Sequence, residues 1–259
     1  MNEGRNDDQS EERRAAERRI YEHPGYKEYT ELEALERSII GVFVPNLREL
    51  VALLNAAAID EALAIELVQN VREPIVRDQF HAQVTQRLHN YLASAQSLVD
   101  HVRRLMRDRT GEITEEFEHR KAKTLRNLEV PFMVDLRNYT LHRTLPFLGH
   151  VLSLTQINTP EQKMVSEVQL VTAQLLEWDG WSSNGHAFLQ QSGEAVILRP
   201  VVKRHGELVL RLNSWLHNEL SRANGAALEE VNELVVDVNT ILTGGDRATA
   251  ERRSRRDFS

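Results

Sequence analysis

The chain of 259 residues contains no cysteine, and this absence excludes every site that is built from thiolates. Zinc ribbons, iron–sulfur clusters and disulfide frameworks therefore cannot form. The histidines lack the spacing of a zinc-protease helix, and the few glycines form neither a phosphate-binding loop nor a nucleophile elbow. The sequence thus predicts a protein that uses no metal and no cofactor.

Positive charge is also in deficit, because 39 Asp and Glu outnumber 32 Lys and Arg and leave a net charge of −7. A uniformly basic nucleic-acid-binding surface is therefore excluded, although a local basic patch is not. Residues 28–80 carry ten acids against four Arg, whereas residues 101–143 carry ten basic side chains against seven acids. This positive segment is compatible with a phosphate-bearing ligand, and equally with solvated helix faces.

Long apolar runs are missing as well. The first 19 residues lack the hydrophobic stretch of a signal peptide, and the apolar segments are too short and too often interrupted to span a bilayer. A hydrophobic fraction of 41% is typical of a globular protein. We therefore expect a cytoplasmic protein without a membrane partner.

Both ends of the chain are rich in charge and poor in apolar residues. Residues 1–19 are predicted to form a disordered charged tail. Gly244 and Gly245 end the apolar pattern, and residues 244–259 are predicted to be a disordered basic tail. That second tail is interpreted as a solvated end, with a weak phosphate-attracting arm as the alternative.

Apolar residues between the tails recur every three or four positions, which predicts helices. We expect an N-terminal helical segment over 20–74, in which Pro45 ends one helix and Asn46 caps the next, which runs to Val71. Further helices are expected at 75–108, 112–128, about 131–145, 203–223 and 226–242.

The pattern changes between residues 164 and 202, where turn signals surround a β-rich stretch at 195–202. A small β-hairpin is expected there, with a short helix near 181–191. Trp178, Trp181 and Trp215 flank this region and are interpreted as anchors of a core or a dimer surface. The predicted fold class is therefore all-α, a helical bundle with a small β element.

One helix carries a motif that suggests chemistry, running from Arg137 through Asn138 and Tyr139 to His142. Five pairs have four to six residues between an Arg and a following His, a number of the order expected by chance in a chain with 27 Arg. These pairs are Arg18/His23, Arg137/His142, Arg143/His150, Arg199/His205 and Arg211/His217. Only Arg137/His142 combines a polar residue after the Arg with an uninterrupted, apolar-flanked helix.

This motif resembles the signature of the HEPN superfamily, whose members are helical bundles with an Arg, a polar residue and a His at this spacing. The resemblance implies a HEPN-like helical domain over 75–243 that follows the N-terminal extension. It also implies a homodimer in which two Arg and two His converge on an RNA phosphate. A metal-independent endoribonuclease of this kind is a toxin or defence component, with RNA as its substrate and a protein partner such as an antitoxin.

Within that resemblance each residue has an expected role. His142 moves the proton of the ribose 2′-hydroxyl or of the leaving group, and Arg137 holds the phosphate and stabilises its developing charge. Asn138 orients His142, Tyr139 stacks on a base, and Arg143 contributes to substrate binding.

Other interpretations remain open. In one alternative Arg137 pairs with Asp135, Glu129 or a neighbouring helix. In another, His142 is a partly buried bundle residue. A HEPN-like module that binds RNA, a nucleotide or a protein without catalysis is the second hypothesis, and a plain helical scaffold is the third. The active-site hypothesis requires that Arg137 and His142 are not both sealed in the core.

Overall fold

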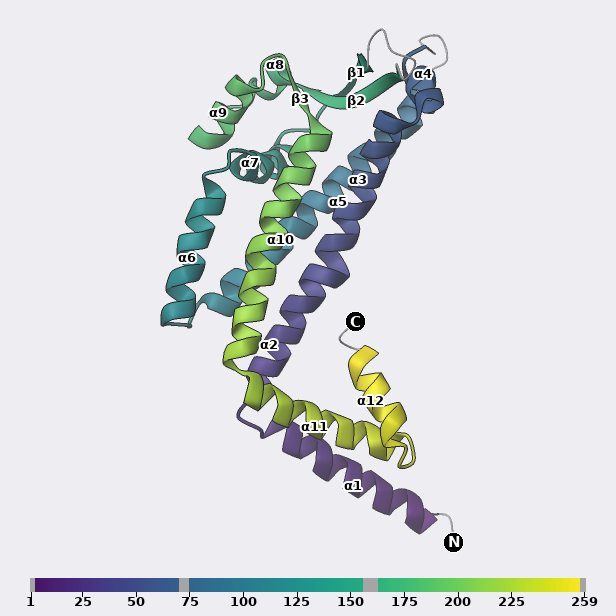
Figure 1. Cartoon of the computed structure of the whole chain (residues 1–259), viewed down its shortest axis with the longest axis vertical. Helices are drawn as coiled ribbons and strands as arrows, with labels where there is room; N and C mark the ends of the chain where they lie inside the picture. The colour runs from purple at the N-terminus through teal and green to yellow at the C-terminus, as the bar shows by residue number, and fades with distance from the viewer. Residues whose placement is uncertain (1–2, 70–74, 156–162, 257–259) are drawn as a thin grey trace. The chain divides into compact units, whose positions relative to one another are not determined.

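The computed structural model describes residues 3–69, 75–155 and 163–256, and most of them are helical (Figure 1), which confirms the all-α class. The helices are α1 (Glu3–Tyr21), α2 (Tyr26–Glu36), the π-helix η1 (Arg37–Phe43), α3 (Val44–Ile59), α4 (Glu61–Gln69), α5 (Ile75–Met106), α6 (Glu112–Leu125), α7 (Glu129–His142), α8 (Thr172–Leu175), α9 (Ser183–Gln191), α10 (Leu198–Ala223), α11 (Gly225–Leu242) and α12 (Arg247–Arg256). The strands are β1 (Leu148–Thr155), β2 (Lys163–Val171) and β3 (Ala195–Ile197).

The chain forms two compact units, and their limits differ from the predicted segments. One unit combines the residues up to 37 with those from 215 onward, and the other contains residues 38–214. The predicted boundaries at 19, 74 and 243 therefore separate residues that pack together. Local sequence pattern marks where helices end, but it carries no information about which distant helices share a core.

In the first unit the N-terminal residues form α1 rather than a disordered tail. Ala16 and Ile20 lie four residues apart on one face of this helix and are buried together with Val231 and Val238 of α11. Arg13 pairs with Glu17 on the exposed side. The two apolar positions are too few to make the segment look helical in the sequence, but they suffice when α11 covers them.

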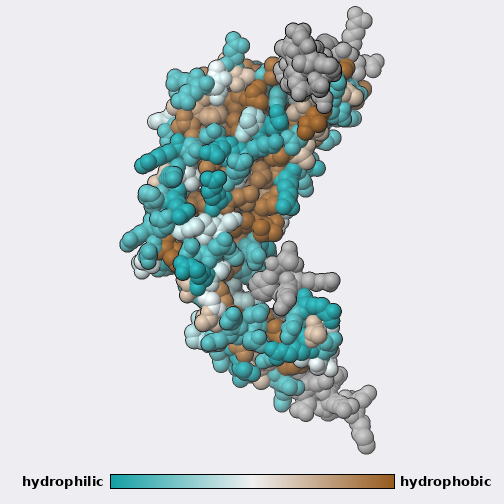
Figure 2. All heavy atoms as spheres, viewed as in Figure 1, coloured by the Kyte–Doolittle hydropathy of each residue, from teal (hydrophilic) through white to brown (hydrophobic). Residues whose placement is uncertain are grey.

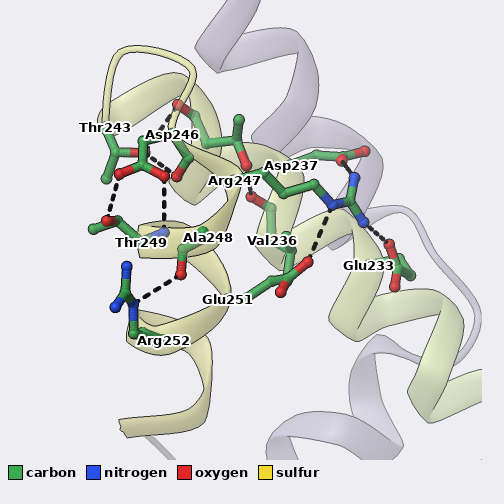
Figure 3. A network of polar contacts seen from close by, with 11 residues as sticks. Glu233, Val236, Asp237, Thr243, Asp246, Arg247, Ala248, Thr249, Glu251 and Arg252 are labelled. Carbon is green, nitrogen blue, oxygen red and sulfur yellow. Dashed lines mark hydrogen bonds and ion pairs between the residues drawn. The ribbon is translucent and has the colours of Figure 1, made fainter.

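The C-terminal residues likewise form a helix, α12, rather than a disordered basic tail (Figure 3). The Asp246 carboxylate accepts hydrogen bonds from the Thr249 amide at 3.1 Å and the Thr249 hydroxyl at 2.5 Å, and so caps the helix. The bond from the Thr249 hydroxyl lowers the pKa of Asp246. Arg247 bridges Glu233 of α11 and Glu251 of α12, so ion pairs join the two helices.

Replacing the cap should therefore loosen α12. We expect Asp246→Ala to make amide hydrogen exchange in α12 several-fold faster, because the first-turn amides lose their acceptor. Hydrogen exchange followed by mass spectrometry measures this difference. Asp246→Asn is the matched control, since an amide oxygen can also cap. Equal exchange in the Ala variant and the unchanged protein would show that the cap does not hold α12.

The second unit begins within the π-helix η1, and here the helix does not end at Pro45 as predicted. Pro45 falls in the first turn of α3, where a missing amide proton costs little, so the chain stays helical. Asn46 does not cap a helix, because its side-chain nitrogen donates to the Val42 carbonyl at 2.8 Å. The actual break comes at Asp60, whose carboxylate accepts from the Leu63 amide and caps α4. The predicted end at Val71 lies outside the described residues.

One helical stretch, Tyr26–Ile59, is long and apolar enough to cross a membrane by length and composition. Figure 2 shows hydrophobic surface over the middle of this stretch, where Ile40 and Val42 are exposed. Its other side packs inside the protein, since Leu50 and Leu54 are buried and α3 contacts α5 and β2. A helix in a protein core has the same composition, so cytoplasmic localisation stays a prediction.

The predicted β element exists, but its limits differ. The three strands form an antiparallel sheet in the order β1-β2-β3. Leu170 of the central strand β2 lies opposite Leu148 of β1 on one side and opposite Val196 of β3 on the other. Strand β1 lies before residue 164 and was not predicted. Residues 198–202 belong to α10 rather than to a strand, because their β-branched side chains serve equally well as a buried helix face.

Candidate functional site

Helix α7 carries the predicted motif, and aromatic side chains fasten one side of it to α9. Phe132 stacks on Phe188 and Trp181 with ring centroids 4.4 and 5.7 Å apart. Tyr139 joins this cluster through Trp178 and Trp181 and is only 5% exposed. Burial also raises the pKa of Tyr139. The predicted stacking of Tyr139 on an RNA base is therefore wrong for this conformation, whereas Trp181 is a core anchor as predicted.

Asp135 is the acid nearest to the motif, and it is bound to α9 rather than to Arg137. Its carboxylate accepts from the Ser182 amide at 2.9 Å and from the Ser182 hydroxyl at 2.6 Å. The Ser182 oxygen in turn accepts from the Gly185 amide and caps α9. Because the carboxylate is used in this way, the alternative in which Asp135 neutralises Arg137 is excluded.

The accessible side of α7 carries Val134, Arg137, Asn138, Leu141 and His142. Arg137 and His142 are 140° apart on an ideal helix, so they mark the two edges of this side. Arg137 donates to the side-chain oxygen Oδ1 of Asn138 at 3.1 Å. It makes no ion pair with any residue that the structure describes. Asn138 was predicted to orient His142. In the structure its side chain contacts Arg137 instead.

His142 is the last residue of α7 and is exposed, as is Arg143, which follows the helix. Three large apolar side chains nearby are exposed as well: Leu141 by 47%, Leu145 by 54% and Phe147 by 66%. We call these three residues the α7 apolar patch. Neither Arg137 nor His142 is sealed in the core, so the structural condition for the active-site hypothesis is met.

A cavity of about 490 Å³ opens beside Arg137, between α5, α6, α7 and α10. Its walls are largely apolar. They include Leu92, Val99, Phe117, Met133, Val209 and Leu212. Arg137 is among the lining residues, but His142, Asn138, Tyr139 and Arg143 are not. A single chain therefore does not bring the Arg and the His of the motif into one pocket.

Two polar side chains of α10, His205 and Asn213, line the same cavity, and neither was predicted to belong to a site. His205 is buried, and its Nδ1 lies 2.5 Å from the Tyr91 hydroxyl. Burial lowers the pKa of His205 to about 4 and raises that of Tyr91, so a neutral phenol and a neutral imidazole share this hydrogen bond. Asn213 is buried and donates to the Val209 carbonyl at 2.7 Å. Nothing in the sequence reveals these positions, because Tyr91 and His205 are 114 residues apart.

A pair of half-buried histidines lies at the edge of the sheet. His81 of α5 stacks on His150 of β1 with ring centroids 4.8 Å apart, and His150 Nδ1 lies 2.9 Å from the Ser166 hydroxyl. Burial lowers the pKa of His81, and it lowers that of His150 to about 4. Within the described parts of the chain, no group of three or more His, Asp or Glu side chains is placed to hold a metal ion.

Comparison with protein-family models, with curated proteins and with solved structures gives no match for this chain. The candidate site therefore depends on the residues and the geometry described above.

Proposed function

We propose that the protein is a metal-independent endoribonuclease of the HEPN kind that acts as a homodimer. The observation that carries this proposal is the accessible side of α7, where an Arg without a carboxylate partner and an exposed His stand beside the α7 apolar patch. An uncompensated guanidinium attracts an anion, and a phosphodiester is an anion that an Arg binds through two parallel hydrogen bonds.

The chemistry follows from the two side chains. His142 takes the proton of the ribose 2′-hydroxyl or returns one to the leaving oxygen, since imidazole exchanges protons near neutral pH. Arg137, held by Asn138, stabilises the charge that develops on the phosphate. The expected products are a 2′,3′-cyclic phosphate and a free 5′-hydroxyl.

The dimer supplies what one chain lacks. Arg137 and His142 lie at opposite edges of the accessible side, so a complete site needs a second α7. Leu141, Leu145 and Phe147 offer apolar surface next to His142, and a second copy of the chain would cover it. Arg143 then lies where it can contact the RNA backbone. A toxin or defence role and an antitoxin partner are part of this proposal.

An RNA-cleavage assay in EDTA tests the proposal directly. We expect His142→Ala and Arg137→Ala each to reduce the cleavage rate about a hundredfold, the loss typical of removing an acid–base or charge-stabilising group. Arg211→Ala is the matched control, because Arg211 is exposed and precedes His217 at a comparable spacing. Cleavage that is equally fast in both motif variants would refute the assignment.

A second variant tests the dimer in the same assay. Phe147→Glu should convert the dimer to a monomer in light scattering and reduce cleavage as strongly as the motif variants, because it places a charge in the α7 apolar patch. An active monomer would contradict the shared site. If the unchanged protein binds RNA but never cleaves it, the alternative of a non-catalytic RNA-binding module is favoured.

A further inference from the structure

The cavity beside Arg137 has two kinds of surface that a single ligand would need to match. Its interior is apolar and is formed by four different helices, including Val102 of α5, Phe117 of α6, Met133 of α7 and Val209 of α10. A volume of about 490 Å³ lies in the range of small-molecule sites, which is roughly 300–1,000 Å³. An apolar chain or ring would be removed from water on most sides there.

The rim of this cavity is positively charged. Arg103, Arg107, Lys121 and Arg137 line it, against the single acid Glu118. Arg103 pairs with Asp100, and Lys121 pairs with Glu118. Arg107, which directly follows α5, and Arg137 of α7 make no ion pair with any described residue, so their two guanidinium groups remain available to an anion.

The buried polar groups of α10 add a second, independent feature. The Tyr91 hydroxyl already binds His205 Nδ1, so Nε2 is the ring nitrogen of the neutral imidazole that is left for a ligand. Nε2 has no hydrogen-bond partner among the residues that the structure describes, and His205 lines the cavity. The purely apolar wall of a sealed core has no polar atom without a hydrogen-bond partner, whereas the wall of this cavity has His205 Nε2.

We propose that this cavity binds a small amphiphile with an anionic head, whose apolar chain enters between the four helices. The carboxylate or phosphate head accepts hydrogen bonds from Arg107 and Arg137 at the rim. This ligand class matches an apolar interior with a cationic entrance, whereas a free nucleotide would place its charged phosphates or polar base against apolar side chains. The proposal concerns binding alone and holds whether or not the protein cleaves RNA.

Isothermal titration calorimetry with the full chain tests this proposal. Decanoate and decyl phosphate are the two anionic probes, and decanol, which has a chain of the same length, is the neutral probe. We expect saturable binding of one anionic probe molecule per chain, at least tenfold tighter than binding of decanol. The stronger of the two anionic probes identifies the preferred head. Absence of saturable binding, or equal affinity for decanol, would overturn the proposal.

Two variants locate the site. Arg107→Ala should weaken decanoate binding about tenfold and leave decanol binding unchanged, because it removes one charged donor at the rim. Arg104→Ala is its matched control, since Arg104 is an exposed Arg three residues earlier, in the last turn of α5, and does not line the cavity. Ala95→Trp should abolish binding of all three probes by filling the cavity. Unchanged affinity in Arg107→Ala and in Ala95→Trp would place the ligand elsewhere.

Discussion

Phe132→Ala should lower the free energy of unfolding of the unit formed by residues 38–214 by about 3–5 kcal/mol. Phe132 is fully buried, and its ring lies between Phe188 and Trp181, which join α7 to α9. The substitution leaves a cavity in an aromatic cluster that cannot easily collapse, since Tyr139 and Trp178 hold the other rings in place. This loss is a large fraction of the stability of a typical domain.

Urea unfolding followed by tryptophan fluorescence measures this loss, because Trp181 is a direct neighbour of the substituted ring. Phe132→Leu is the matched control and should cost clearly less, since it keeps most of the apolar volume. A change below about 1 kcal/mol in the Ala variant would show that the cluster does not hold α7 to α9. The proposed RNA cleavage should decline along with stability, because α7 carries Arg137 and His142.

Acid should destabilise the protein steeply between about pH 6.5 and pH 4, and His205 is expected to be the largest single cause. Burial lowers the pKa of His205 to about 4 in the folded chain, whereas an unfolded histidine titrates near 6.5. Above pH 6.5 both states are neutral and the group contributes nothing. As the pH falls below that value the unfolded state gains a proton that the folded state cannot accept, so the free energy of unfolding falls by about 3 kcal/mol in total.

The histidine pair at the sheet edge acts in the same direction. Burial lowers the pKa of His150 to about 4 as well, and the neighbouring His81 and Arg77 oppose its protonation further. Because these rings are less deeply buried than His205, water screens part of their effect. The predicted result is one acid transition in which the two sites add.

His205→Gln separates the two contributions, because a glutamine keeps a hydrogen-bond acceptor for the Tyr91 hydroxyl but does not titrate. Urea unfolding of this variant at a series of pH values should give a shallower loss of stability between pH 6.5 and pH 4 than in the unchanged protein. His142→Gln is the control, since His142 is exposed and should leave the slope unchanged. Equal slopes in the protein and in His205→Gln would contradict the prediction.

The helices that the sequence predicts well are those that bury one regular face. The expected helix at 75–108 corresponds to α5 at Ile75–Met106, because Phe80, Val84, Leu88 and Leu98 repeat with helical spacing and are all buried. The predictions fail where a few distant contacts decide the structure. Ala16 and Ile20 of α1 are buried by Val231 and Val238 of α11, which lie about 200 residues further along the chain.

The candidate site shows the same limit. The pattern of α7 indicated an Arg and a His on one helix, and both side chains are accessible. It did not indicate that Tyr139 faces the aromatic cluster, because Trp178 and Trp181 come from a different part of the chain. Arg107, His205 and Asn213 meet at one cavity only through the packing of α5 against α10. No local spacing connects residues that are about a hundred positions apart.

The division of the chain has a consequence for the order of its folding during synthesis. Residues 38–214 form one unit, so they are all available before α11 has been made. Ala16 and Ile20 of α1 must wait for Val231 and Val238, which follow about 200 residues later. At a translation rate of roughly 5–20 residues per second, that delay is roughly 10–40 s. The apolar face of α1 is thus uncovered on the ribosome until the last helices emerge, and α1 and α11 join only at the end of synthesis.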